Sequence, residues 1–114
     1  MPDGRIMHCE YNLGGARLFL SEELPEHGGT PSPASLGSTT VALHLYVTDC
    51  DETVERMESL GAQVLDAPQN LFWGERFARV RDPFGHEWGI ATRLREMSPD
   101  EIQAAANKLF EASN

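Results

Sequence analysis

Histidines and a carboxylate on two short segments are the residues of this chain best suited to chemistry. His8 and Glu10 stand two residues apart in 6–13 ("IMHCEYNL"), and His44 lies in 40–47 ("TVALHLYV"). Side chains two residues apart on a strand share a face. His8 and Glu10 could therefore ligate a metal together or act as an acid–base pair. With His44 they could form a two-histidine, one-carboxylate set.

Each of these residues also has an ordinary structural interpretation. A lone histidine is weak evidence for a site, and hydrogen bonds to its ring nitrogens would explain His44 equally simply. The polar face that carries His8 and Glu10 could be solvated, as one face of an antiparallel ribbon often is. We therefore favour no metal and no other cofactor, while a divalent metal on His44, His8 and Glu10 stays open.

A second group of candidates follows in 73–81 ("WGERFARVR") and 81–92 ("RDPFGHEWGIAT"). An arginine inside a pocket would hold a carboxylate or phosphonate by two parallel hydrogen bonds, and we select Arg76 for this role. Trp73 could wall the pocket, although an aromatic residue is more often part of a core. Glu87, beyond the turn, is a further pocket candidate, and its ordinary structural interpretation is that of a surface glutamate.

Length and charge restrict the class of protein. The 114 residues predict one domain, 1–114. The net charge of −9 repels phosphate backbones and anionic lipids, so we expect neither nucleic acid nor a membrane as partner. No apolar run approaches the ~20 residues that span a bilayer. Two cysteines fit a reducing compartment, so we expect a cytoplasmic protein in which Cys9 and Cys50 are structural.

Hydrophobic periodicity and turn residues predict an α+β fold. Gly14 and Gly15 predict a hairpin turn, Asp49 and Ser98 are helix caps, and Asp82 begins a type I turn. The expected parts are a hairpin (1–22), a loop (23–39), a complete βαβββ module (40–94) and a terminal helix (98–113). The expected elements are strands 6–13, 16–22 and 40–47, helix 49–61, a short strand that ends before Pro68, a loop or bulged strand over 69–75, strands 76–82 and 86–94, and helix 98–113.

Strand 40–47 should present two different faces. Val41, Leu43, Leu45 and Val47 alternate with Ala42, His44 and Tyr46. The first set should pack against helices, and the second should face a pocket. Tyr46 therefore joins His44 among the expected pocket residues.

Two long stretches together resemble one superfamily. "HLYVTDCDETVERMESLGAQVL" followed by "FWGERFARVRDPFGHEWGIAT" resembles the vicinal oxygen chelate superfamily of glyoxalases, extradiol dioxygenases, fosfomycin-resistance enzymes and bleomycin-binding proteins. The stretches "PDGRIMHCE", "WGERF" and "DPFGHEW" look most like its PhnB-like branch. The resemblance covers nearly the whole chain.

The resemblance implies paired βαβββ modules around a pocket, frequent homodimers and, in many members, a divalent metal. It puts His44 at a metal-ligand position and Arg76 on the arginine of the branch's "G-D/E-R" pattern. Metal-dependent relatives carry a glutamate ligand seven residues after the turn aspartate. Here that position is Gly89, which has no side chain, and Glu87 could replace it only if the metal moved.

The chain departs from the family pattern at its start. Relatives of this type have a strand, a helix and a strand before the stretch that matches "PDGRIMH", so the hairpin 1–22 looks like the remainder of a first module. An open strand edge invites pairing with another chain. We therefore expect either a second subunit or the helix 98–113 to cover the gap, and a homodimer is the expected state.

The preferred function is a small-molecule binding protein of the glyoxalase and bleomycin-resistance type without a catalytic metal. The ligand pocket would comprise His8, Glu10, His44, Tyr46, Trp73, Arg76 and Glu87, and it would take a planar or anionic ligand. The alternative is a metal-dependent lyase, isomerase, thiol transferase or dioxygenase of the same superfamily. A third possibility is a structural remnant with no pocket of its own.

Overall fold

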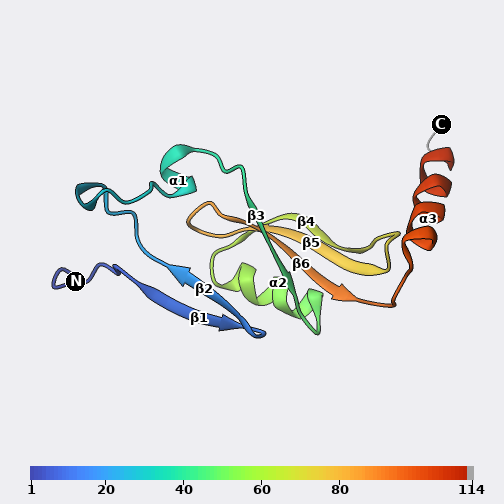
Figure 1. The fold of residues 1–114 in the computed structure, drawn as a ribbon, viewed down its shortest axis with the longest axis horizontal. Coiled ribbons are helices and arrows are strands. Elements are labelled where there is room, and N and C mark those ends of the chain that lie inside the picture. Colours follow the sequence, from blue (N-terminus) through green and yellow to red (C-terminus); the bar gives the residue numbers. More distant parts are fainter. Residues whose placement is uncertain (113–114) are drawn as a thin grey trace.

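Four strands form the main sheet of the computed structural model, which describes residues 1–112. Their order is β3–β6–β5–β4, with β3 parallel to β6 and the other neighbours antiparallel. The helix α2 (Cys50–Ser59) follows β3 and covers one face of this sheet (Figure 1). The predicted α+β class is confirmed. The strands are β3 (Ala42–Tyr46), β4 (Gln63–Asn70), β5 (Glu75–Arg81) and β6 (Glu87–Arg93).

The hydrophobic core lies between α2 and the two central strands. Cys50 and Val54 of α2 pack on Ala78, Val80 and Ile90, all of them buried. The Sγ of Cys50 donates to the carbonyl of Ile90 at 3.3 Å, and burial raises the pKa of this thiol. Cys50 is therefore a structural residue with an unreactive thiol, as expected.

Asp82 organises the turn between β5 and β6. Its Oδ1 accepts from the backbone N–H groups of Phe84 (2.9 Å) and His86 (3.0 Å). Its Oδ2 accepts from Nε1 of Trp88 at 3.0 Å. The backbone N–H of Gly85, at φ +90°, donates to the Asp82 carbonyl, which closes the predicted turn. One carboxylate thus fixes both the turn and the indole packed beside the core.

Two elements stand apart from the main sheet. The hairpin of β1 (Cys9–Leu13) and β2 (Ala16–Leu20) turns at Gly14 and Gly15, both with positive φ. The helix α3 (Pro99–Ala112) begins after Ser98, the expected cap, whose Oγ accepts from the Glu101 N–H at 3.2 Å. Within residues 1–112, no other helix or strand approaches the hairpin or α3.

The molecule is consequently elongated. Its extents are 56 × 30 × 26 Å, and the Cα radius of gyration is 17.6 Å. A compact domain of this length would have a radius of gyration of about 13 Å. The hairpin and α3 lie toward opposite ends of the longest axis (Figure 1). Among the residues described, no helix is long and apolar enough to cross a bilayer.

One predicted boundary was wrong, and an expected loop contains short helices. The strand β4 does not end before Pro68 but continues to Asn70, because β4 is an edge strand whose register shifts between Asp66 and Gln69. A proline is tolerated at such an irregular edge position. The loop 23–39 contains two short helices, η1 (Pro25–His27) and α1 (Pro33–Leu36). Position 113 of the predicted terminal helix lies outside the described residues.

We expect Asp82→Ala to lower the free energy of unfolding by about 2 kcal/mol, because three N–H donors lose a charged acceptor. Urea denaturation would measure this. Asp66→Ala removes an exposed carboxylate paired with Arg79 and should cost under about 0.5 kcal/mol. Equal effects of the two substitutions would contradict the role given to Asp82.

Candidate functional site

The face of the sheet opposite α2 carries the candidate site. On β3 the side chains of Leu43 and Leu45 are half-buried toward the helix, whereas His44 and Tyr46 are exposed on the other face. The strand register aligns His44 with Gly89. This is the alternation expected from the sequence, and it follows because burial of one face under α2 leaves the other face open.

Aromatic rings form a connected row on this open face. The imidazole of His44 stacks on Phe77, with ring centroids 5.7 Å apart and an interplanar angle of 19°. The Tyr46 ring meets His44 edge-on at 4.9 Å, and Trp73 meets Phe77 at 6.1 Å. Phe72 extends the row, 4.8 Å from Trp73. Offset and edge-to-face contacts of this kind add to the energy of simple burial.

Gly89 makes the stack possible. A Cβ atom at this position would lie 3.0 Å from Cε2 of Phe77 and 3.2 Å from Nδ1 of His44. Both distances are shorter than ordinary van der Waals contacts. The glycine therefore lets the two rings close over the strand. The rings fill the space that a glutamate side chain at position 89 would need.

A cleft of about 1040 Å³ is lined by three rings of the aromatic row, those of Tyr46, Phe72 and Trp73. Glu75, which is 6% exposed, lies in its wall and accepts a hydrogen bond of 2.6 Å from Nε1 of Trp73. The guanidinium of Arg93 sits 5.3 Å from the centre of the Tyr46 ring. The lining of the cleft includes Tyr46, Trp73, Glu75, Arg93, Arg95 and Glu101. The cleft thus combines aromatic surface with a buried carboxylate.

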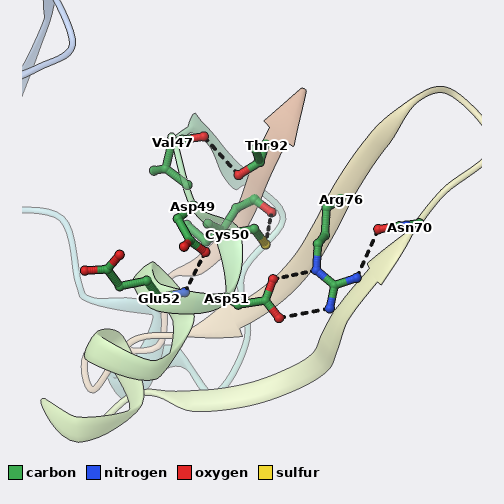
Figure 2. Close-up of polar contacts among 9 residues, drawn as sticks. Val47, Asp49, Cys50, Asp51, Glu52, Asn70, Arg76 and Thr92 are labelled. Carbon is green, nitrogen blue, oxygen red and sulfur yellow. Dashed lines mark hydrogen bonds and ion pairs between the residues drawn. The ribbon is translucent and has the colours of Figure 1, made fainter. Parts of the chain in front are cut away.

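Arg76 lies on the opposite face, beside α2. It shares that face of β5 with the buried residues Ala78 and Val80. Its guanidinium makes a two-pronged ion pair with Asp51, one bond being 2.9 Å, and also donates to Asn70 at 3.0 Å (Figure 2). Hydrogen bonding by Arg76 lowers the pKa of the Asp51 carboxyl. Arg76 is therefore engaged in joining α2 to the sheet and does not face the cleft.

His8 and Glu10 lie on the detached hairpin. Nε2 of His8 is 3.1 Å from Oε1 of Glu10, and His8 also contacts the Phe19 ring at 5.3 Å. Both side chains are about half exposed. They form the pair that their spacing suggested, but the hairpin does not approach the strand that carries His44.

The residues present do not fit a metal centre within one described chain. Among residues 1–112, no group of three or more histidine, cysteine, aspartate or glutamate side chains converges closely enough to hold an ion. Glu87 lines a different hollow of about 420 Å³ beside α1, and its Oε1 is 3.8 Å from Arg81. The imidazole of His44 packs against two aromatic rings, those of Tyr46 and Phe77.

The sequence analysis did not select Phe72, Glu75, Phe77 or Arg93. Strand alternation alone would have put Glu75 and Phe77 together, since they are two residues apart. It would also have put Arg76 on the other face. The choice of Arg76 followed the family pattern instead, which does not specify the side on which a side chain of β5 emerges.

Comparison with known proteins defines the family. The sequence profile of the Glyoxalase/Bleomycin resistance protein/Dioxygenase superfamily matches residues 2–90, so the chain belongs to this superfamily. It is 42% identical over 106 residues to the uncharacterized proteins Mb0911c of Mycobacterium bovis and Rv0887c of Mycobacterium tuberculosis. The match covers 91% of this chain but 70% and 62%, respectively, of those proteins.

Solved structures agree on the fold. TioX from Micromonospora sp. ML1 is 27% identical, with a TM-score of 0.59 over 81% of this chain and 72% of TioX. A glyoxalase-related enzyme from Fulvimarina pelagi is 23% identical, with a TM-score of 0.56 over 76% of this chain and 65% of that enzyme. The second likeness supports the fold alone.

We expect Gly89→Ala to lower the free energy of unfolding by about 1–2 kcal/mol, because the added methyl group overpacks the two rings. In a Phe77→Leu background the same substitution should cost clearly less, since of the two rings that the methyl group meets only His44 remains. A double-mutant cycle in urea measures this coupling. Equal costs of Gly89→Ala in both backgrounds would show that the ring contact does not constrain position 89.

Proposed function

We propose that this protein binds a small, flat, aromatic molecule that carries a positive charge or a strong hydrogen-bond donor, without a resident metal. The observation that carries the proposal is the buried carboxylate of Glu75 in a cleft beside exposed aromatic rings. Pockets that bind small molecules combine apolar walls with a few placed polar groups. The rings of Tyr46, Phe72 and Trp73 would supply the wall, and Glu75 would supply the polar anchor.

Charge favours a cation over the anion that the sequence first suggested. Arg76, the expected anion-binding residue, is occupied by Asp51 on the helix side of the sheet. The cleft is lined by three glutamates and two arginines, and the whole chain carries −9. A net negative field raises the local concentration of cationic molecules. A buried carboxylate gains most from a charged donor, because charge-assisted hydrogen bonds are the stronger ones.

Two tricyclic probes of opposite charge test this function. We expect 9-aminoacridine, a flat cation, to quench the fluorescence of Trp73 and to raise the Tm, because a bound ligand stabilises the native state. The flat anion 9-anthracenecarboxylate should bind at least about tenfold more weakly, a difference of about 1.4 kcal/mol. Fluorescence titration and thermal shift measure the two affinities.

Substitutions assign the binding to the cleft. Glu75→Gln keeps an oxygen for the Trp73 indole but removes the charge, so the Kd for 9-aminoacridine should rise about 10- to 100-fold, the value of a hydrogen bond to a charged group. Glu55→Gln, on the exposed side of α2, removes the same charge elsewhere and should leave the Kd unchanged. Preference for the anion, or equal effects of the two substitutions, would overturn the proposal.

The metal-dependent alternative makes a different prediction. A Lewis acid would need three or more protein ligands, and of the described residues His44 alone has a position that the family resemblance supports. We expect protein purified without chelator to contain less than about a tenth of an equivalent of Zn, Ni, Mn or Fe, and the Tm not to rise when these ions are added. Stoichiometric metal removed by His44→Ala would favour the enzyme instead.

The same proposal includes two finer assignments. The residues in 73–77 and 82–88 support placement in the PhnB-like branch of the superfamily. Cys9 and Cys50 are both unpaired, which fits the reducing interior of a cell and supports a cytoplasmic location.

A further inference from the structure

Two opposite charges occupy neighbouring strand positions in the cleft and yet do not pair. Strand register sets Glu75 of β5 directly opposite Arg93 of β6, and both residues line the cleft. Opposite charges in this cross-strand arrangement ordinarily attract each other. Within residues 1–112, however, neither residue forms an ion pair. The Glu75 carboxylate instead accepts from the indole of Trp73, and the Arg93 guanidinium lies over the ring of Tyr46.

The absence of a partner distinguishes the arginines of the cleft from those of the neighbouring strand. All three arginines of β5 form ion pairs with carboxylates. Arg93 and Arg95, which line the cleft, form none in the described part of the chain. A chain with 18 acidic and 9 basic residues has no shortage of carboxylates. The guanidinium of Arg93 is therefore available to a carboxylate of a ligand, which arginine holds by two parallel hydrogen bonds.

Gly74 holds the two charged residues in this arrangement. Its carbonyl accepts from the N–H groups of Leu94 (2.9 Å) and Arg95 (3.3 Å), the two residues that follow Arg93. Gly74 is buried with φ +84°, and a Cβ there would lie 2.9 Å from the Arg95 carbonyl oxygen. A glycine therefore lets the turn before Glu75 approach the end of β6 this closely. The backbone positions from which both charges extend are thus fixed before a ligand binds.

We propose that the ligand of this cleft is zwitterionic: a flat aromatic molecule whose positive group binds Glu75 and whose carboxylate binds Arg93, as an aromatic α-amino acid does. The proposed function already requires the aromatic cation, so this assignment rests on it and adds the anionic group. The carboxylate draws the Arg93 guanidinium from the Tyr46 ring, because paired charge-assisted hydrogen bonds are stronger than an exposed cation–π contact. Since such a ligand has no net charge, the field of the −9 chain does not repel it as it repels a simple anion.

Three indole compounds separate the contributions of the two charges. Tryptamine carries the ammonium alone, 3-indolepropionate carries the carboxylate alone, and L-tryptophan carries both. We expect the Kd of L-tryptophan, measured by isothermal titration calorimetry at pH 7, to be at least about tenfold below that of tryptamine, the gain from hydrogen bonds between charged groups. The Kd of 3-indolepropionate should exceed both, because its carboxylate meets the negative field without a cation to offset it.

Substitution of Arg93 tests whether this residue provides the gain. Arg93→Gln should raise the Kd of L-tryptophan about tenfold and leave the Kd of tryptamine within about twofold, because tryptamine has no carboxylate to lose its partner. Arg93 is exposed, so the substitution should not disturb the fold. Arg56→Gln, in the last turn of α2, removes the same charge outside the cleft and should leave both affinities unchanged.

The possible results separate the zwitterionic ligand from the aromatic cation site on which it rests. L-tryptophan binding no more tightly than tryptamine, or equal losses of both ligands in Arg93→Gln, would refute the zwitterion while leaving the cation site intact. Equal effects of Arg56→Gln and Arg93→Gln would refute it too, because a general change in field would then explain the gain. Failure of tryptamine, L-tryptophan and 9-aminoacridine all to bind would refute the proposed function itself, and the zwitterion with it.

Discussion

Burial of one face of the four-stranded sheet under α2 is the constraint on which the remaining structure depends. Cys50 and Val54 fill the space above Ala78, Val80 and Ile90, and this contact fixes which side of each strand faces inward. Because side chains alternate, every residue between the buried ones emerges on the open face. The positions of His44, Tyr46 and Phe77 in the aromatic row are thus a consequence of core packing. The Arg76–Asp51 pair strengthens the same contact at its edge, where α2 begins (Figure 2).

The size of that core explains why the other parts of the chain matter. Fully buried apolar side chains are few, and most of them are small. Large hydrophobic residues of the hairpin and of α3, such as Phe19 and Phe110, stay exposed. A chain of this length that leaves so much apolar surface in water gains little from the hydrophobic effect. Burial between the main sheet and α2 therefore supplies only part of the stabilisation of the whole chain.

Much of the module could be predicted from local sequence, because its determinants are local. Asp82 and Gly85 specify their turn, Asp49 and Ser98 cap their helices, and strict alternation puts His44 outward. The extension of β4 through Pro68 could not be predicted, since it depends on a register shift against β5.

The candidate site was less predictable, because its geometry depends on contacts between residues that are distant in the sequence. Whether His8 and Glu10 approach His44 depends on where the hairpin packs, and no local pattern specifies that. The face on which Arg76 emerges was available from alternation with Ala78 and Val80. The role of Glu75 could not be predicted from the sequence, because a glutamate at a strand end is usually solvated and only the structure shows the cleft.

The cleft and the terminal helix are physically connected. Ser98, Glu101 and Ile102, at or next to the start of α3, line the cleft together with Tyr46 and Trp73. Among the described residues no helix or strand packs against α3, so the width of the cleft on this side depends on the segment that joins β6 to α3.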